Sequence, residues 1–285
     1  MKPPTLVALG LALCALVLLY GEIAAGLVAT WWTNDDYSHG FLIVPLCAYL
    51  VWERRDRLAA MTPRPSTAGA AVVLASLLVL IVGQLGAELF LSRLSLIGVV
   101  GGSVLFFLGW RYLATLAFPL GCTLLMIPLP AIVFNQITLP LQTTASRVAE
   151  WTLSTVGVPV LRDGNLIHLS NTTLEVAEAC SGIRSLISLL TLSIVFGYFT
   201  ETASTRRLVL ALATVPIAIA ANAARVAGTG VLAHAAGPAT AEGFFHTFAG
   251  WLVFMFATAM LFALQWILGR TSNRMSAQST AELAL

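Results

Sequence analysis

The sequence predicts an all-α polytopic membrane protein, with about eight transmembrane helices and a small extracytoplasmic cap that contains an amphipathic helix and a β-hairpin. The first observation behind this prediction is composition: of 285 residues, 58% are hydrophobic and 10% are charged, and the mean hydropathy is +0.89. Soluble domains carry about 25% charged residues. The other two observations are repeated long apolar runs and a biased placement of basic residues. The net charge of +2 predicts no nucleic-acid partner.

The spans are predicted from length and apolarity, because about 20 apolar residues are needed to cross the hydrocarbon core of a bilayer. They cover residues 5–29, 38–52, 67–90, 93–109, 112–128, 181–200, 207–230 and 243–268, of which the second is short. The first run continues past Glu22 without a clear cleavage site, so we expect a retained helix and not a removed signal peptide. All spans belong to one integral membrane domain, residues 1–270, followed by a cytoplasmic tail, residues 271–285.

Basic residues predict the orientation of the spans. With the amino terminus in the cytoplasm, the carboxyl terminus is also cytoplasmic, and ten of the 15 basic residues fall on that side. These ten are Lys2, Arg54, Arg55, Arg57, Arg64, Arg111, Arg206, Arg207, Arg270 and Arg274. The other five, Arg93, Arg147, Arg162, Arg184 and Arg225, then lie on or near the outer side, where each needs a structural or catalytic reason.

Residues 131–179 interrupt the run of spans and are expected to form the cap. The first part mixes apolar residues at helical spacing with polar ones, which predicts an interfacial amphipathic helix, bent near Pro140. Asp163 and Gly164 stand between apolar residues and indicate a hairpin turn. A further short strand, residues 173–176, then leads to Cys180.

Cys180 is the candidate nucleophile. It stands where a polar outer segment becomes a membrane helix, and a helix start favours the thiolate, with Arg184 one turn later. Cys14, Cys47 and Cys122 fall within predicted spans, where cysteine usually packs. Since no other cysteine lies in the outer segments, Cys180 is either protected or reactive there. The alternative is a buried packing or capping thiol.

Arg225 is the second candidate. It shares one helix face with Asn222 and Thr229 in a run of alanine and glycine that permits close helix packing. A charge within a span costs at least a few kcal/mol, so it normally faces a partner or a wet cavity. The alternatives are snorkelling to the outer interface, or an ion pair with Glu178 or Glu242.

His246 begins the last span, at a depth that matches Cys180 and Arg225. Its reference pKa near neutrality makes it the candidate general acid and base. His39 precedes the second span on the same outer face and is the rival for this role, although we favour structural or substrate-positioning work for it. No H-E-x-x-H or C-x-x-C spacing is present, so we expect no metal and no cofactor.

The chain resembles the exosortases over about residues 30–265. The resemblance is carried by Asp36-Tyr37-Ser38-His39-Gly40, Phe118-Pro119, Met126-Ile127-Pro128-Leu129-Pro130, Gly157-Val158-Pro159-Val160, Ala179-Cys180-Ser181-Gly182-Ile183-Arg184, Asn222-Ala223-Ala224-Arg225-Val226 and His246. Exosortases are inner-membrane cysteine transpeptidases of Gram-negative bacteria, and archaeosortases are related to them. They are thought to process exported proteins that end in a Pro-Glu-Pro signal, a membrane span and a basic tail, often in bacteria that make exopolysaccharide.

The resemblance implies a catalytic set of Cys180, Arg225 and His246, with the site on the periplasmic side of the inner membrane. Cys180 would form a thioester, His246 would move protons, and Arg225 would stabilise charge or hold substrate. His39, Arg184, Asn222 and Glu178 are the candidate supporting or substrate-binding residues. Two alternatives stay open: a protease that resolves the thioester with water, and a transporter or exopolysaccharide-assembly component in which Cys180 only packs.

Overall fold

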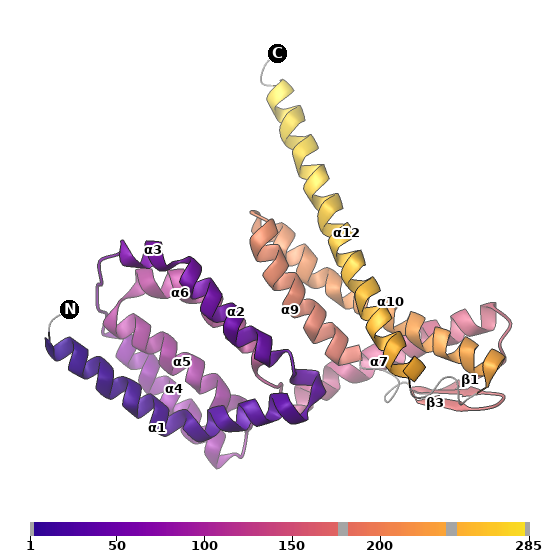
Figure 1. The fold of residues 1–285 in the computed structure, drawn as a ribbon, viewed down its shortest axis with the longest axis horizontal. Helices are drawn as coiled ribbons and strands as arrows, with labels where there is room; N and C mark the ends of the chain where they lie inside the picture. The colour runs from indigo at the N-terminus through magenta and orange to yellow at the C-terminus, as the bar shows by residue number, and fades with distance from the viewer. Residues whose placement is uncertain (1–2, 176–181, 238–243, 283–285) are drawn as a thin grey trace. The chain divides into compact units, whose positions relative to one another are not determined.

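The computed structural model describes residues 3–175, 182–237 and 244–282, which fold into two compact units, Met1–Val133 and Phe134–Leu285. Figure 1 shows helices throughout and one small sheet. The elements of the first unit are α1 (Pro3–Thr33), η1 (Asp35–Tyr37), α2 (Gly40–Glu53), α3 (Arg55–Ala59), α4 (Ala68–Leu85), α5 (Leu89–Phe107), α6 (Trp110–Cys122) and η2 (Thr123–Met126).

Small residues bring α4 and α5 close together in the first unit. A Cβ added at Gly102 would lie 2.9 Å from the backbone nitrogen of Val73, and one added at Gly98 would overlap Ser76. Membrane helices lack a hydrophobic force between them, so this close van der Waals contact is what holds such pairs together. The contact explains why two apolar runs separated by a short turn form an antiparallel pair.

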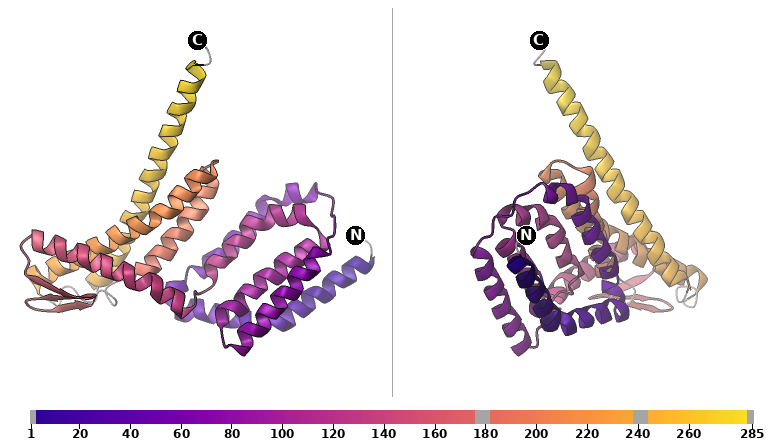
Figure 2. Two further views of the ribbon diagram at one scale, coloured as in Figure 1. Left: turned by 180° about the vertical axis from the view of Figure 1, so that it is seen from behind. Right: turned by 60° about the vertical axis from the view of Figure 1, so that its left-hand side comes forward.

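The second unit contains most of α7 (Ala131–Thr155), the sheet, and three long helices (Figure 2). Its strands are β1 (Val160–Asp163), β2 (Leu166–Leu169) and β3 (Thr173–Glu175), antiparallel in the order β1-β2-β3. Its helices are α9 (Gly182–Thr200), α10 (Ser204–Ala236) and α12 (Phe244–Glu282). Gly164 has a φ of +61° in the turn between β1 and β2, where glycine is favoured.

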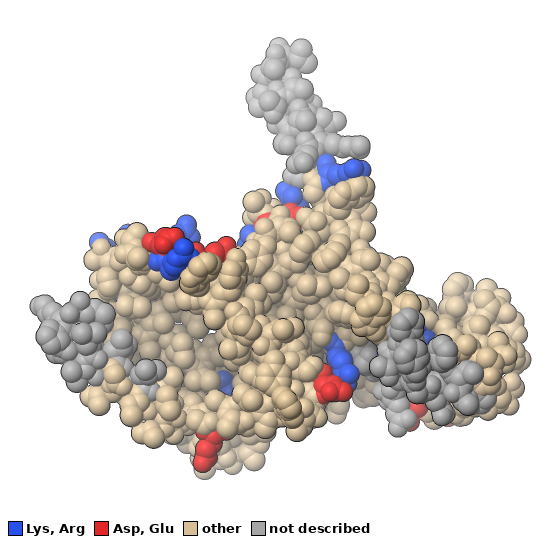
Figure 3. Space-filling view, in the orientation of Figure 1, with Lys and Arg blue, Asp and Glu red and all other residues tan. Residues whose placement is uncertain are grey.

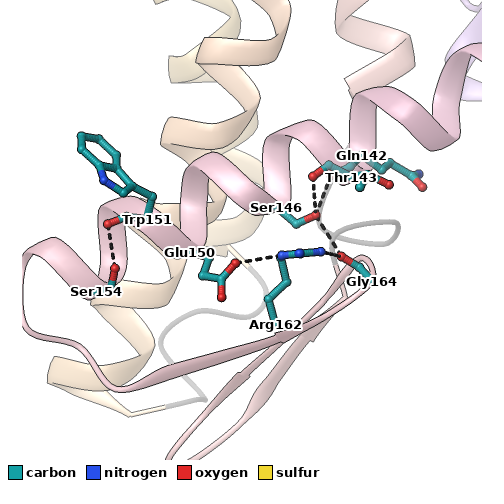
Figure 4. Close-up of polar contacts among 8 residues, drawn as sticks. All are labelled: Gln142, Thr143, Ser146, Glu150, Trp151, Ser154, Arg162 and Gly164. Carbon is teal, nitrogen blue, oxygen red and sulfur yellow. Dashed lines mark hydrogen bonds and ion pairs between the residues drawn. The ribbon is translucent and has the colours of Figure 1, made fainter.

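Side chains from α7, the sheet and the second half of α10 form the core of the cap. The buried residues of this core are Ala149, Leu153, Val158, Ile167, Leu169, Val226, Ala227 and Ala233. The Nε of Arg162 on β1 donates to the Oε2 of Glu150 on α7 at 2.8 Å, and Ser146 donates to the carbonyl of Gly164 at 3.3 Å (Figure 4). The cap is therefore fixed to the helix that carries Arg225.

A second core joins α9, α10 and α12. It is built from Leu189, Leu210, Ile217, Ala221, Ala257 and Leu261, and all three helices contribute to it. Since α10 takes part in both cores, it is the element that connects the cap to the membrane helices of this unit.

The predicted fold class is confirmed. Each of the eight predicted spans corresponds to a helix, and the cap contains the predicted helix, hairpin and further strand. Among the described residues, five helices are long and apolar enough to cross a membrane, or six if the bent pair α6–η2 and α7 counts as one span. The number is below eight because α2 has only 14 residues and the described apolar part of α9 is Arg184–Thr200.

Pro140 lies inside α7, and the bend predicted there stays a prediction. A sharp bend of 78°, which the sequence did not predict, lies between Trp110–Met126 and Ala131–Thr155. Pro128 and Pro130 stand in this connection and disfavour helical backbone in the residues before them, which explains the position of the break.

Candidate functional site

A small cavity lies among α9, α10 and α12, and Arg225 is one of the residues that line it. The cavity volume is about 10 Å³, which is enough for about one water molecule. Its polar lining comes from Arg225 and Asn222 on α10 and from Ser185 on α9. The remaining lining residues are small or apolar: Leu189, Ala218, Ala221, Gly250, Val253, Phe254 and Ala257.

Arg225 is buried, with 8% of its surface exposed. Several of its buried neighbours on α10 are small residues: Ala221, Ala223 and Ala227. A Cβ added at Gly250 on α12 would lie 3.2 Å from Nη2 and 3.3 Å from Cζ of Arg225. Glycine at position 250 therefore lets the backbone of α12 approach the guanidinium closely. An arginine stays charged at any accessible pH, so the site holds a permanent positive charge within the helix bundle.

Asn222 is buried beside Arg225, also at 8% exposure, and Thr229 is half-buried further along the same helix. The amide of Asn222 can both donate and accept hydrogen bonds. Arg225, Asn222 and Ser185 thus present donors and acceptors to a space of the size of one water molecule.

Of the other two members of the predicted catalytic set, only the backbone of His246 is described. His246 lies in the first turn of α12, four residues before Gly250, so the two positions share a helix face. The side chain of His246 lies outside the described part of the structure, as do residues 176–181, which include Glu178 and Cys180. Ser185, which lines the cavity, follows Cys180 by five residues.

Arg184 lies in the first turn of α9 and is exposed. It does not line the cavity, although the next residue, Ser185, does. Successive positions on a helix point about 100° apart, which accounts for the difference. The structure therefore brings Asn222 and Arg225 together and leaves Arg184 outside their cavity.

His39 lies in the first unit, at the start of α2, and its side chain forms a hydrogen bond with the backbone. Its Nε2 hydrogen-bonds with the carbonyl of Leu125 at 3.0 Å, so Nε2 carries the proton. Trp31 donates from Nε1 to the carbonyl of Met126 at 2.9 Å. Tyr37 interacts with the backbone of Leu129, and burial raises the pKa of the Tyr37 hydroxyl.

Three side chains between Trp31 and His39 thus hold the backbone just before α7, where the chain bends by 78°. This supports a positioning role for His39. Sequence reasoning missed the contribution of Trp31, and it missed Ser185 and Gly250 at the cavity. A serine or glycine in an apolar helix carries no signal of its own until the neighbouring helix is known.

Among the described residues, no group of three or more histidine, cysteine or carboxylate side chains could hold a metal ion. Cys14, Cys47 and Cys122 are free thiols in the described residues. Cys122 is buried within α6 and Cys47 is half-buried within α2, as expected for cysteines that pack.

Comparison with known proteins gives one family. Residues 31–263 match the family model described as transmembrane exosortase, and the match extends over parts of both compact units. A search of curated proteins found no match. A search of solved structures also found none.

Proposed function

Because the chain belongs to the transmembrane exosortase family, a family to which transpeptidase activity is ascribed, we propose that it is a membrane-embedded cysteine transpeptidase. It cleaves the carboxy-terminal sorting signal of exported proteins, which consists of a Pro-Glu-Pro motif, a membrane span and a basic tail. It then transfers the protein to an acceptor nucleophile. The observation that carries this proposal is the family match over residues 31–263, which includes all three proposed catalytic positions.

In the proposed mechanism, the thiolate of Cys180 attacks the carbonyl carbon of the scissile peptide bond. The tetrahedral oxyanion that forms is stabilised by the guanidinium of Arg225, which cannot act as a base. His246 protonates the departing amine, and the C–N bond breaks to leave a thioester on Cys180. His246 then takes a proton from the incoming amine, which attacks the thioester; the C–S bond breaks, and the Cys180 thiolate and the protonated His246 are regenerated.

The described geometry supports the role given to Arg225. Arg225 lines a cavity among α9, α10 and α12. In the sequence, α9 begins two residues after Cys180, and His246 stands in the first turn of α12. A cavity with little water strengthens the interaction between a guanidinium and a developing oxyanion. Asn222 would help to hold the substrate carbonyl, and Glu178 or Arg184 would contact the sorting signal near the membrane surface. His39 would act indirectly, through the bend before α7.

The proposed setting is the inner membrane of a bacterium, with both termini in the cytoplasm and the site on the periplasmic side. The two units then act as one membrane domain, and residues 131–179 cover the site from outside. The span of the substrate would bind laterally from the bilayer. The proposed partners are exported proteins with the signal described above, and the machinery of exopolysaccharide production. The proposal uses no metal and no cofactor.

The experiment is co-expression of the protein with a secreted reporter that ends in such a signal. Cys180→Ala and Cys180→Ser should leave the reporter at its full length, because neither variant can form the thioester. Cys14→Ala, which removes an exposed free thiol elsewhere, should process the reporter as the unaltered protein does. Full processing by Cys180→Ala would rule out covalent catalysis and favour a transport or assembly role.

A further inference from the structure

A polar cavity of about 350 Å³ lies at the opposite end of the three-helix core from Arg225. It is lined by Thr200, Glu201, Thr202, Arg206, Gln265, Trp266, Gly269 and Arg270, which come from the end of α9, the connection to α10, the first turn of α10, and α12. Figure 3 shows basic and acidic atoms at this end of the core. The proposed reaction uses none of these residues.

Glu201 is buried at this cavity and hydrogen-bonds to two of the residues that line it. It is 3% exposed, and its two carboxylate oxygens accept hydrogen bonds from Arg206 at 2.9 Å and from Gln265 at 3.1 Å. Its backbone carbonyl accepts from Nε of Arg207 at 2.7 Å. The negative charge of Glu201 is therefore compensated within the protein, and these contacts lock Arg206 and Gln265 in place.

The remaining charge at the cavity is positive. Arg270 is exposed and its guanidinium lies 3.6 Å from the centre of the Trp266 ring. Among the described residues that line the cavity, Arg206 and Arg270 are the basic ones and Glu201 is the acidic one. Arg207 is bonded to the backbone of Glu201. A guanidinium fork matches the oxygens of a phosphate group. The hydroxyls of Thr200 and Thr202 and the amide of Gln265 add neutral polar groups to the lining.

The depth of the cavity matches the headgroup layer of a bilayer. Two candidate spans, Ser204–Ala236 and Gly250–Arg270, end beside it. Counting about 1.5 Å per residue, Arg206 lies about 30 Å along α10 from Arg225, and Arg270 lies about 30 Å along α12 from Gly250. This separation equals the thickness of the hydrocarbon core. Trp266 is 55% exposed at the same level, as is usual for tryptophan at a membrane interface.

We propose that this cavity binds a phosphate group, and that in the membrane this group is the headgroup phosphate of an anionic phospholipid. Arg270 and Arg206 contact the phosphate oxygens, and the acyl chains lie along the exposed apolar surface of α12 next to Trp266 and Ile267. Such a lipid would bridge the α9–α10 connection and α12 at the end of the core opposite to Arg225.

Gly269 offers a matched pair of test variants. A Cβ added there meets no atom within 4 Å, so the cavity wall has room for a small side chain. Gly269→Asp introduces a carboxylate without a clash and should repel an anion, whereas Gly269→Ala adds only a methyl group. Arg270→Gln removes a charge from the cavity. Arg111→Gln is its control, because Arg111 is also an exposed arginine near the end of a helix and follows an exposed tryptophan, Trp110.

The test is native mass spectrometry of the full protein in detergent, titrated with phosphatidylglycerol or phosphatidylcholine. We expect phosphatidylglycerol to be retained preferentially, with affinity lowered about fivefold by Arg270→Gln, as for one arginine near an anionic headgroup, and lowered at least as much by Gly269→Asp. Gly269→Ala and Arg111→Gln should bind like the unaltered protein. Equal retention of both lipids, or equal binding by Gly269→Asp and Gly269→Ala, would overturn the proposal.

A second arm separates the two sources of phosphate. Inorganic phosphate is added at millimolar concentration while phosphatidylglycerol is bound. Retention of the lipid supports a headgroup site that also uses acyl-chain contacts. Displacement that depends on Arg270 supports a phosphate site open to soluble anions. Displacement that is equal in Arg270→Gln and the unaltered protein would contradict a phosphate site in this cavity.

Discussion

Arg225 carries a permanent charge and is buried in a helix of small residues. Both properties limit which side chain could take its place without loss of function. Its guanidinium lies against the backbone of α12 at Gly250, beside Asn222 and Ser185. Lysine would keep the charge but would lose the planar fork and its fixed donor directions. The site therefore depends on the shape of the cation as well as on its sign.

We expect Arg225→Lys to slow processing of a signal-bearing reporter by about tenfold or more, which corresponds to about 1.4 kcal/mol of lost transition-state stabilisation. Pulse-chase labelling of the reporter measures the rate. The amount of protein in the membrane should be unchanged, because the charge and most of the volume remain. An unaltered rate would mean that Arg225 contributes only charge or packing.

Gly250 permits the close approach of α12 to Arg225. In Gly250→Ala the new methyl group would lie 3.2 Å from Nη2, so the flexible guanidinium has to move by a few tenths of an ångström. We expect processing to fall by about two- to tenfold, because small displacements of a positioned group weaken catalysis. Gly269→Ala on the same helix meets nothing within 4 Å and should leave the rate unchanged.

Thermal unfolding in detergent accompanies this comparison. Both alanine variants should unfold at or slightly above the temperature of the unaltered protein, since alanine favours a helix over glycine. If Gly250→Ala and Gly269→Ala lose activity equally, then contact with Arg225 is not the reason.

At the scale of elements, α10 contributes to both cores of the second unit. Its second half packs against the cap and its first half against α9 and α12. Leu153 of α7 is fully buried in the cap core, and a Cβ added at Gly230 of α10 would lie 3.0 Å from both of its methyl carbons. The small residues of α10 therefore admit the large apolar side chains of the cap.

We expect Leu153→Ala to lower the free energy of unfolding by about 2–5 kcal/mol, the range for leucine truncation in a packed core. Unfolding of the purified protein by titration with a denaturing detergent measures this change. Leu139→Ala is the control, because Leu139 is on the same helix and is 60% exposed. Equal effects of the two substitutions would show that the cap has no core against α10.

The elements also show which parts of the fold are readable from sequence. The long apolar runs and the Asp163–Gly164 turn predicted their helices and hairpin because each depends on local composition. The sequence did not predict the sharp bend before α7, where the prolines at 128 and 130 act together with contacts from Trp31 and His39, which are distant in sequence. Long-range contacts of this kind leave no periodic pattern.

For the whole molecule, the sequence predicted a membrane protein and the candidate residues, but not the cavity that two of them line. Asn222 and Arg225 were selected because polar residues in an apolar helix are costly. Ser185 and Gly250 became visible only when α9, α10 and α12 were packed together. Which helices meet is decided by the shape of their small-residue surfaces, and the sequence of one helix alone does not state it.

The proposed orientation makes a prediction for the whole chain. Alkaline phosphatase inserted at the turn between β1 and β2 should be active, because this enzyme folds only outside the cytoplasm. A green fluorescent protein fused to the carboxyl terminus should fluoresce, because it matures inside. The positive-inside distribution of arginine is the physical reason for both results. The reverse pattern of activity and fluorescence would invert the proposed orientation.

The central claim is that Cys180 forms a thioester with the sorted protein, next to Arg225 and His246. Its most direct test is to treat membranes that contain the protein and a signal-bearing substrate with hydroxylamine, and to examine Cys180 by mass spectrometry before and after. The account predicts a substrate fragment that is bound to Cys180 and that hydroxylamine releases. Substrate cleavage without any acyl group on Cys180, or with the acyl group on another residue, would contradict it.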